Sequence, residues 1–131
     1  MPRNISFSMS TAAVLDESKT VTRRLGWGNL KPGDRLWGVK KAMGLKKGEH
    51  VERLKLIEVV SVRLEPLDDM ERLSLAEQAL EMKREGFPRM TVPEFISMFV
   101  QANHLERETY SPRSQVVRRI EFRYIHEEVA R

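Results

Sequence analysis

The longest apolar stretch of the chain runs from Val51 to Leu64, and it restricts the fold more than any other feature. Leucine, isoleucine and valine recur throughout it, and neither glycine nor proline interrupts it. This enrichment in β-branched and aliphatic residues predicts one or two central β-strands. No apolar run in the chain approaches the roughly 18 residues that a membrane helix needs. We therefore expect no membrane-spanning segment.

Weaker patterns on both sides complete the expected architecture. Ile5, Phe7 and Met9 alternate with serines, which predicts a half-buried strand over 4–9 with these three side chains inward. The other expected elements, in chain order, are a helix from residue 10 or 11 to 18, strands over 20–25 and 35–39, helices over 74–84 and 91–102, a polar loop over 103–114 and a closing strand over 115–124. Because few uninterrupted β-α-β units occur, we predict an α+β fold, with a mixed, mostly antiparallel sheet or barrel flanked by about three helices. The length of 131 residues fits a single domain over residues 1–131.

Two of the expected helices begin with capping signals. Ser74 and Glu77 have the spacing of a capping box, and Thr91 and Glu94 repeat it with a proline in the first turn. Gly86 stands where a glycine commonly ends a helix. These local signals place the helix boundaries independently of the hydrophobic pattern.

The charge distribution indicates a polyanionic partner. The formal net charge is +4 and the isoelectric point is about 9.6. Basic residues crowd the chain through residue 55, whereas residues 58–85 lean acidic, which suggests one basic face. There is no cysteine, so disulfides, thiolate chemistry and cysteine-type zinc sites are excluded, and the three histidines lack metal-ligand spacing. We expect no metal and no cofactor, and, without an export signal at the N-terminus, a cytoplasmic location.

The segment Ser18–Arg24 carries the most concentrated chemistry. On a strand, Thr22 and Arg24 share a face because side chains alternate with period two, and Lys19 can reach the same face from the end of the preceding helix. Two cations and a hydroxyl together can bind phosphate or carbonyl oxygens, and the hydroxyl can also attack. The neighbouring Arg23 and Arg24 disfavour the charged form of Lys19, so its pKa is expected to fall. From spacing alone, a solvated basic turn is the commoner interpretation.

Other candidate ligand-binding residues follow this segment. Trp27 lies in a glycine-flanked loop, where its ring could stack on a base or pack over the end of the barrel. Trp37 lies in a predicted strand and is expected in the core. Lys40 and Lys41 could belong to a stripe that follows phosphates, or to a solvated hairpin.

Four motifs in this order resemble the ASCH-domain family. The family signature Gly-x-Lys-x-x-Thr-x-Arg matches at Lys19, Thr22 and Arg24, with Glu17 in place of the glycine, which predicts a differently shaped turn. The other three motifs are the Leu-Lys-Pro-Gly-Asp turn at 30–34 that leads into a strand, the Glu-Gly pair at 85–86 and the closing strand at 119–122. The whole resembles the small ASCH proteins of bacteria and phages.

This resemblance implies a PUA-like barrel with a cleft beside the Lys-Thr-Arg segment. Members of the family are proposed to bind RNA, and one small bacterial branch removes acyl groups from acylcytidine. Carried over by motif position, the catalytic set of that branch is Lys19 as base, Thr22 as nucleophile and Glu85 as the group that orients the lysine. Glu85 has a plainer interpretation as a charged residue in the last turn of a helix, although an acid is unfavourable there. The insertion-like segment 42–50 could alter the cleft.

Three functions are therefore open at this stage. The favoured one is a binding module that takes RNA, another single-stranded nucleic acid or a modified nucleoside, with Lys19, Arg23 and Arg24 on phosphate and Trp27 on a base. The second is an amidohydrolase that uses Lys19, Thr22 and Glu85. The third is a phage accessory protein that binds a host protein.

Overall fold

The computed structural model describes residues 2–42 and 45–126 of the chain. The strands are β1 (Arg3–Ser6), β2 (Val21–Arg24), β3 (Arg35–Val39), β4 (Arg53–Pro66) and β5 (Val116–Tyr124). The helices are α1 (Thr11–Leu15), α2 (Leu75–Glu85), α3 (Val92–Ala102) and α4 (Leu105–Glu108), with two short 3-10 helices, η1 (Leu67–Arg72) and η2 (Pro112–Ser114).

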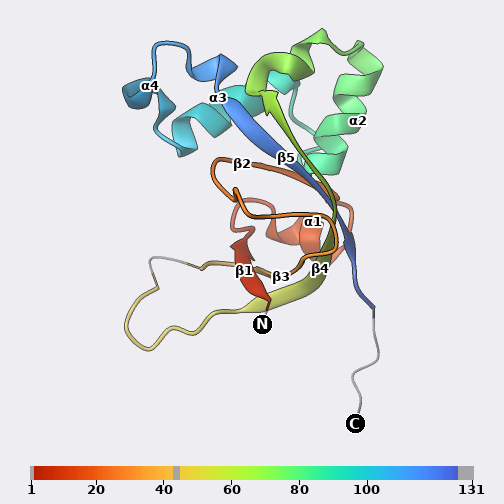
Figure 1. Cartoon of the computed structure of the whole chain (residues 1–131), viewed down its shortest axis with the longest axis vertical. Coiled ribbons are helices and arrows are strands. Elements are labelled where there is room, and N and C mark those ends of the chain that lie inside the picture. The colour runs from red at the N-terminus through yellow and green to blue at the C-terminus, as the bar shows by residue number, and fades with distance from the viewer. Residues whose placement is uncertain (1, 43–44, 127–131) are drawn as a thin grey trace.

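The five strands form one mixed sheet in the order β1-β3-β4-β5-β2. β1 runs parallel to β3, and the other three neighbouring pairs are antiparallel. The sheet curls into half of a barrel, and α2, α3 and α4 gather at one end of it (Figure 1). The predicted α+β class, with a mostly antiparallel sheet, is confirmed.

The apolar stretch that opened the sequence analysis forms a single strand, β4. Its first half pairs with β3, and β5 pairs with it from Ile57 to Pro66. The pairing with β5 shifts register between Val59 and Ser61. Such a bulge bends the strand and increases its twist. One long strand can therefore belong to both sides of the curled sheet.

The three predicted helices are all present. The Ser74 hydroxyl accepts a hydrogen bond from the Glu77 amide at 3.2 Å, so α2 begins as its capping signal predicts. In α3 both halves of the capping box form, between Thr91 and Glu94. α4 and η2 lie inside the segment predicted as a polar loop, so that expectation is wrong in part. Elements of three or four residues are too short to show a hydrophobic period.

Two hydrophobic cores lie on either side of the middle of the molecule. One is shared by η1, α2, α3, α4 and the start of β5, and it includes Met82, Phe95 and Ile96. The other lies inside the curled sheet under α1 and includes Phe7 and Ile57. Full burial of each large apolar side chain contributes about 1.5–3 kcal/mol. The space between the two cores is where the candidate site lies.

Two predictions about side-chain burial are wrong. Met9 is 58% exposed, because β1 ends at Ser6 and the chain turns before Met9, so the alternation stops. Trp37 is only half-buried: it alternates with the buried Leu36 on β3, and the Arg53 guanidinium lies 4.7 Å from its ring centre. Within residues 2–42 and 45–126, no helix has the length and apolar character to cross a membrane.

Candidate functional site

The segment Ser18–Arg24 is held between a helix end and a strand. The Thr20 amide donates to the Arg84 carbonyl, in the last turn of α2, at 2.8 Å. The Lys19 carbonyl accepts a hydrogen bond from the Tyr124 hydroxyl on β5 at 2.5 Å. The backbone of the motif is thus joined to two elements that come much later in the chain. Its side chains are positioned by this tertiary attachment.

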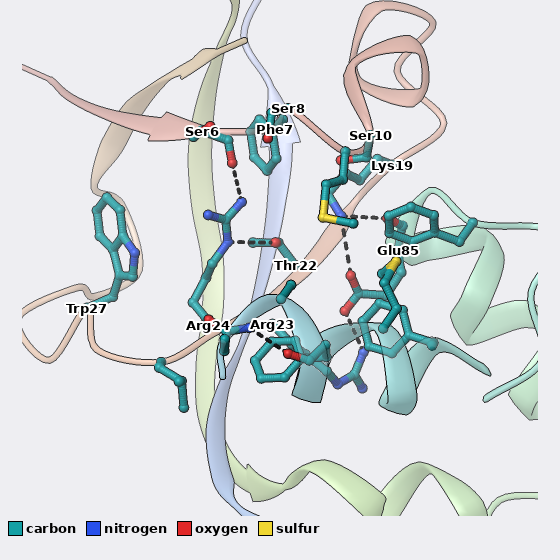
Figure 2. A pocket seen from close by; sticks show the side chains of 18 residues that line it. Ser6, Phe7, Ser8, Ser10, Lys19, Thr22, Arg23, Arg24, Trp27 and Glu85 are labelled. Atoms are coloured by element: carbon teal, nitrogen blue, oxygen red, sulfur yellow. Dashed lines mark hydrogen bonds and ion pairs between the residues drawn. The ribbon is translucent and has the colours of Figure 1, made fainter. Parts of the chain in front are cut away.

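A cavity of about 330 Å³ opens beside this segment. Figure 2 shows Thr22 and Arg24 between Trp27 on one side and Lys19 with Glu85 on the other. Its walls come from the turn after β1, from β2 and the loop that follows it, from the end of α2 and from α3: Ser6, Phe7, Ser8, Met9, Ser10, Lys19, Thr22, Arg23, Arg24, Leu25, Trp27, Glu85, Phe87, Phe95, Met98, Phe99, Ala102 and Asn103. It lies where the two cores meet, since its aromatic residues come from both.

Lys19 is buried in the wall of the cavity, with only 2% of the residue exposed. Its Nζ donates to the main-chain oxygen of Glu85 at 2.5 Å and to the Glu85 carboxylate Oε1 at 3.3 Å. Burial lowers the pKa of Lys19 below its ordinary value, the nearby charges of Arg24 and Arg23 lower it further, and Glu85 opposes them. The predicted direction of the shift is confirmed, but its main cause is burial.

Glu85 reaches Lys19 because α2 ends immediately behind it. Gly86 takes a left-handed backbone conformation, with φ of 91°, and terminates the helix. A Cβ at this position would lie 2.9 Å from the Cβ of Ala13 and 3.3 Å from the Cβ of Lys19. Glycine is thus required both by the backbone conformation and by the close approach of α1. The Glu-Gly pair brings the end of α2 against the motif.

Thr22 and Arg24 share one face of β2, as predicted. The Arg24 Nε donates to the Thr22 hydroxyl oxygen at 3.1 Å, and its Nη2 donates to the Ser6 carbonyl at 2.5 Å. Since β1 and β2 are the two edges of the sheet, the Arg24 side chain bridges the open side of the half-barrel. Within the part of the chain that the structure describes, Nη1 of Arg24 has no hydrogen-bond partner.

Arg23 points to the other side of the strand from Thr22 and Arg24, although part of it lines the cavity. Its guanidinium is buried and bonds to three carboxylates, those of Glu65, Glu81 and Glu85. Burial disfavours its charge, but the three carboxylates outweigh that effect and raise its pKa. Its Nε, Nη1 and Nη2 all donate to carboxylates, and the contact with phosphate expected from the sequence stays a prediction. Arg119 completes the cluster by binding both oxygens of Glu81, at 2.8 and 3.1 Å.

Trp27 is half-buried at the rim of the cavity, so it both packs and presents its ring. Its φ of 60° is unusual for a bulky residue. The Arg3 guanidinium lies 4.8 Å from the centre of its ring. The preceding carbonyl, of Gly26, accepts a hydrogen bond from Arg118 at 2.8 Å. Strained backbone of this kind persists where surrounding contacts hold it in place.

Comparison with solved structures identifies the fold. A hypothetical protein, PH0355, has 18% sequence identity and a TM-score of 0.57, over 95% of this chain and 100% of its own. Protein EF3133 from Enterococcus faecalis, described under DUF984, has 16% identity and a TM-score of 0.62, over 99% of this chain and 86% of its own. An ASCH domain from Lactobacillus crispatus has 16% identity and a TM-score of 0.58, over 93% of this chain and 78% of its own. The chain has the fold of an ASCH domain. No protein-family model and no curated protein sequence matches the chain.

The ASCH fold accommodates the departure at Glu17. The backbone there has φ of 65°, in the left-handed region that glycine adopts readily. A non-glycine residue adopts that conformation at a cost of roughly 1–2 kcal/mol. The Glu17 carboxylate accepts hydrogen bonds from Lys55 at 3.0 Å and from His126 at 2.7 Å. Substitution at this position thus leaves a turn of the glycine type in place.

Some residues singled out in the sequence lie outside the cavity, and some residues of the ASCH-fold site were missed. Lys40 and Lys41 are exposed beyond the end of β3 and do not line the cavity. Glu65, Glu81 and Arg119 were not anticipated as part of the site. The sequence pattern does not single them out, because strand alternation puts Arg119 on the face opposite Ile120 and Phe122. No group of three or more metal-ligating side chains is found among the residues described.

Proposed function

We propose that the cavity binds one nucleoside-sized ligand. The supporting observation is the lining of the cavity: Lys19, Thr22 and Arg24 supply hydrogen-bond donors, and Phe7, Phe87 and Trp27 supply aromatic rings. Its volume of about 330 Å³ lies at the lower end of the range for small-molecule sites, roughly 300–1,000 Å³. A wall rich in donors favours a ligand with carbonyl or phosphate oxygens. A planar base with such oxygens can stack on Trp27 and accept hydrogen bonds from these donors.

This proposal selects a small ligand from the range of partners expected from the sequence. A long RNA groove would need cations that extend beyond the cavity, and Lys40 and Lys41 do not line it. Arg23 is occupied by carboxylates. A single nucleoside or nucleotide, or one base of a longer strand, remains the occupant that the cavity suits. Binding to a host protein stays a prediction from the sequence.

Ligand binding is expected to depend on Trp27 and not on Trp37. Loss of stacking costs about 1–3 kcal/mol per base, so Trp27→Ala should weaken the affinity for cytidine or acetylcytidine about 5- to 150-fold. Trp37→Ala is the matched control, because Trp37 is also half-buried but lies on the outer face of β3. Isothermal titration of both variants with the nucleosides and with a short single-stranded RNA makes the comparison.

Two results would contradict the proposal. One is equal loss of nucleoside affinity in both tryptophan variants. The other is tight binding of the RNA, steeply dependent on salt, with no binding of any nucleoside. The second result would favour a surface that follows phosphates.

Hydrolysis of an acyl amide is a second candidate, favoured by the burial of Lys19 in the same cavity as Thr22. A lysine with a lowered pKa can take the proton of Thr22 while the hydroxyl oxygen attacks the amide carbon. The carbon–nitrogen bond then breaks, and the proton passes from Lys19 to the leaving amine. Water hydrolyses the threonine ester, which yields a carboxylic acid and free Thr22. Lys19 is bonded to Glu85 and not to Thr22, so this transfer needs a bridging water or ligand group.

Turnover of acetylcytidine is the direct measurement of this second candidate. General-base catalysis contributes about 10²–10⁴-fold, so Lys19→Met should reduce the rate by at least that factor. Thr22→Val should abolish the reaction. Thr20→Val is the control, since Thr20 is two residues away and does not line the cavity. No release of cytidine by the unmodified protein would set this activity aside for that substrate.

A further inference from the structure

Glu85 is a single carboxylate shared between two buried cations. Its Oε1 lies 3.3 Å from Lys19 Nζ, and its Oε2 lies 2.8 Å from Arg23 Nη1 (Figure 2). All three residues are almost completely buried. Each cation therefore limits how strongly the carboxylate can interact with the other. The shorter contact belongs to Arg23.

The rest of the Arg23 guanidinium is fixed independently of Glu85. Its Nε and Nη2 donate to the Glu65 carboxylate on β4 at 3.1 and 3.0 Å. Nη2 also donates to Glu81 on α2 at 2.5 Å. Because the guanidinium is planar and rigid, these bonds determine where Nη1 points. Nη1 is aimed at the carboxylate of Glu85.

We infer that Arg23 is a positioning residue of the site: its guanidinium holds the Glu85 carboxylate so that only one of its oxygens faces Lys19. Arg23 does this from the side of β2 that faces away from Thr22 and Arg24, and this role needs no contact between Arg23 and the ligand. The ion-paired cluster of Arg23, Glu65, Glu81 and Arg119 is thus a frame for the Lys19–Glu85 pair. This inference rests on the proposed function only in giving Lys19 a task toward the ligand.

The frame has a consequence for the protonation of Lys19. An opposite charge nearby favours the charged lysine, and a like charge disfavours it. Arg23 disfavours the charged lysine for two reasons. It is itself a nearby cation, and it pairs with the Glu85 carboxylate, which weakens the attraction between Glu85 and Lys19. Without the guanidinium, Lys19 should be the one of these two cations that still pairs with the Glu85 carboxylate. The charged form of Lys19 then becomes more favourable.

The test is an NMR titration of the Lys19 side chain in the full chain, which needs no ligand. In Arg23→Gln the pKa of Lys19 should rise relative to the unmodified protein. Arg119→Gln is the matched control, because Arg119 belongs to the same cluster but, among the residues that the structure describes, its side chain bonds to Glu81 alone. It should reduce stability while leaving the titration of Lys19 unchanged.

Arg23→Lys provides a second variant if Arg23→Gln does not fold. It keeps a cation for Glu65 and Glu81, but a compact ammonium cannot also span to Glu85. The pKa of Lys19 should still rise, by a smaller amount. An unchanged pKa in whichever folded Arg23 variant is measured, or an equal rise in Arg119→Gln, would overturn the inference. Failure of nucleosides to bind would leave this titration result intact, so the two proposals fail separately.

Discussion

Glu85→Ala is expected to lower the free energy of unfolding by about 3–5 kcal/mol, the usual cost of removing one partner of a buried ion pair. The variant leaves Lys19 with the main-chain oxygen at position 85 as its only hydrogen-bond partner among the residues described. Arg23 keeps Glu65 and Glu81, so most of the loss falls on Lys19. Urea unfolding at neutral pH measures the effect.

The destabilisation by Glu85→Ala should also depend on pH. The pKa of Lys19 in the folded protein is already below its unfolded value, and loss of Glu85 lowers it further. The unfolded state then binds more protons than the folded state, so stability rises as the pH increases through the folded pKa toward the unfolded one. The loss relative to the unmodified protein should be largest below the folded-state pKa of Lys19 in the variant. It should shrink as the pH rises from there to the folded-state pKa of Lys19 in the unmodified protein, both of which lie below the ordinary lysine pKa.

Glu77→Ala is the control for this measurement, because Glu77 lies on the same helix but is exposed. Glu77 stands in the first turn of α2, where a carboxylate contributes about 0.3–1 kcal/mol through the helix dipole, so this change should cost no more than that and should not vary across that pH range. If Glu85→Ala behaves like Glu77→Ala, the contact between Glu85 and Lys19 does not stabilise the fold. A constant loss at all pH values would instead assign the effect to packing.

Gly86→Ala adds a single methyl group to the site and should reduce the stability of the protein strongly. Forcing alanine into a left-handed conformation costs roughly 1–2 kcal/mol. Placing the new Cβ 2.9 Å from that of Ala13 adds an overpacking cost of about 1–3 kcal/mol. We expect the end of α2 to move away from α1. That movement would carry Glu85 away from Lys19.

Gly33→Ala separates the two contributions. Gly33 has φ of 93°, but a Cβ there would meet nothing within 4 Å. Its substitution should therefore cost only the backbone term. A double-mutant cycle with Ala13→Gly measures the contact directly, since that change removes the methyl group that the new Cβ meets. Equal losses for Gly33→Ala and Gly86→Ala, or no coupling in the cycle, would show that α1 does not press on this turn.

Short-range patterns anticipated much of the local structure. The capping residues Ser74 and Thr91 begin α2 and α3 because their side chains satisfy amides within the same helical turn. Gly86 ends α2 for an equally local reason. The joint orientation of Thr22 and Arg24 follows from strand alternation, which depends only on sequence spacing. In each case the interacting groups lie within a few residues of one another.

The same alternation places Arg23 on the opposite side of β2, but the sequence analysis grouped it with Lys19 and Arg24, and nothing in the sequence says what covers that side. Glu65 and Glu81 lie 42 and 58 residues after Arg23 in the chain, and no sequence pattern around Arg23 predicts these contacts. Isolated in sequence, Arg23 resembled a surface cation available to phosphate. Buried charge requires a compensating partner, and only the docking of α2 against β2 and β4 supplies three of them.

The amino-acid sequence by itself determined the long central strand, the helix boundaries and the spacing that puts a threonine and an arginine on one face of β2. The tertiary structure decided that this face lines a cavity, that Lys19 is buried against Glu85 and that Arg23 belongs to the supporting frame. The physical reason is range. Helix caps and strand alternation act between near neighbours in the chain, whereas burial and ion pairing depend on which distant segments the folded chain brings together.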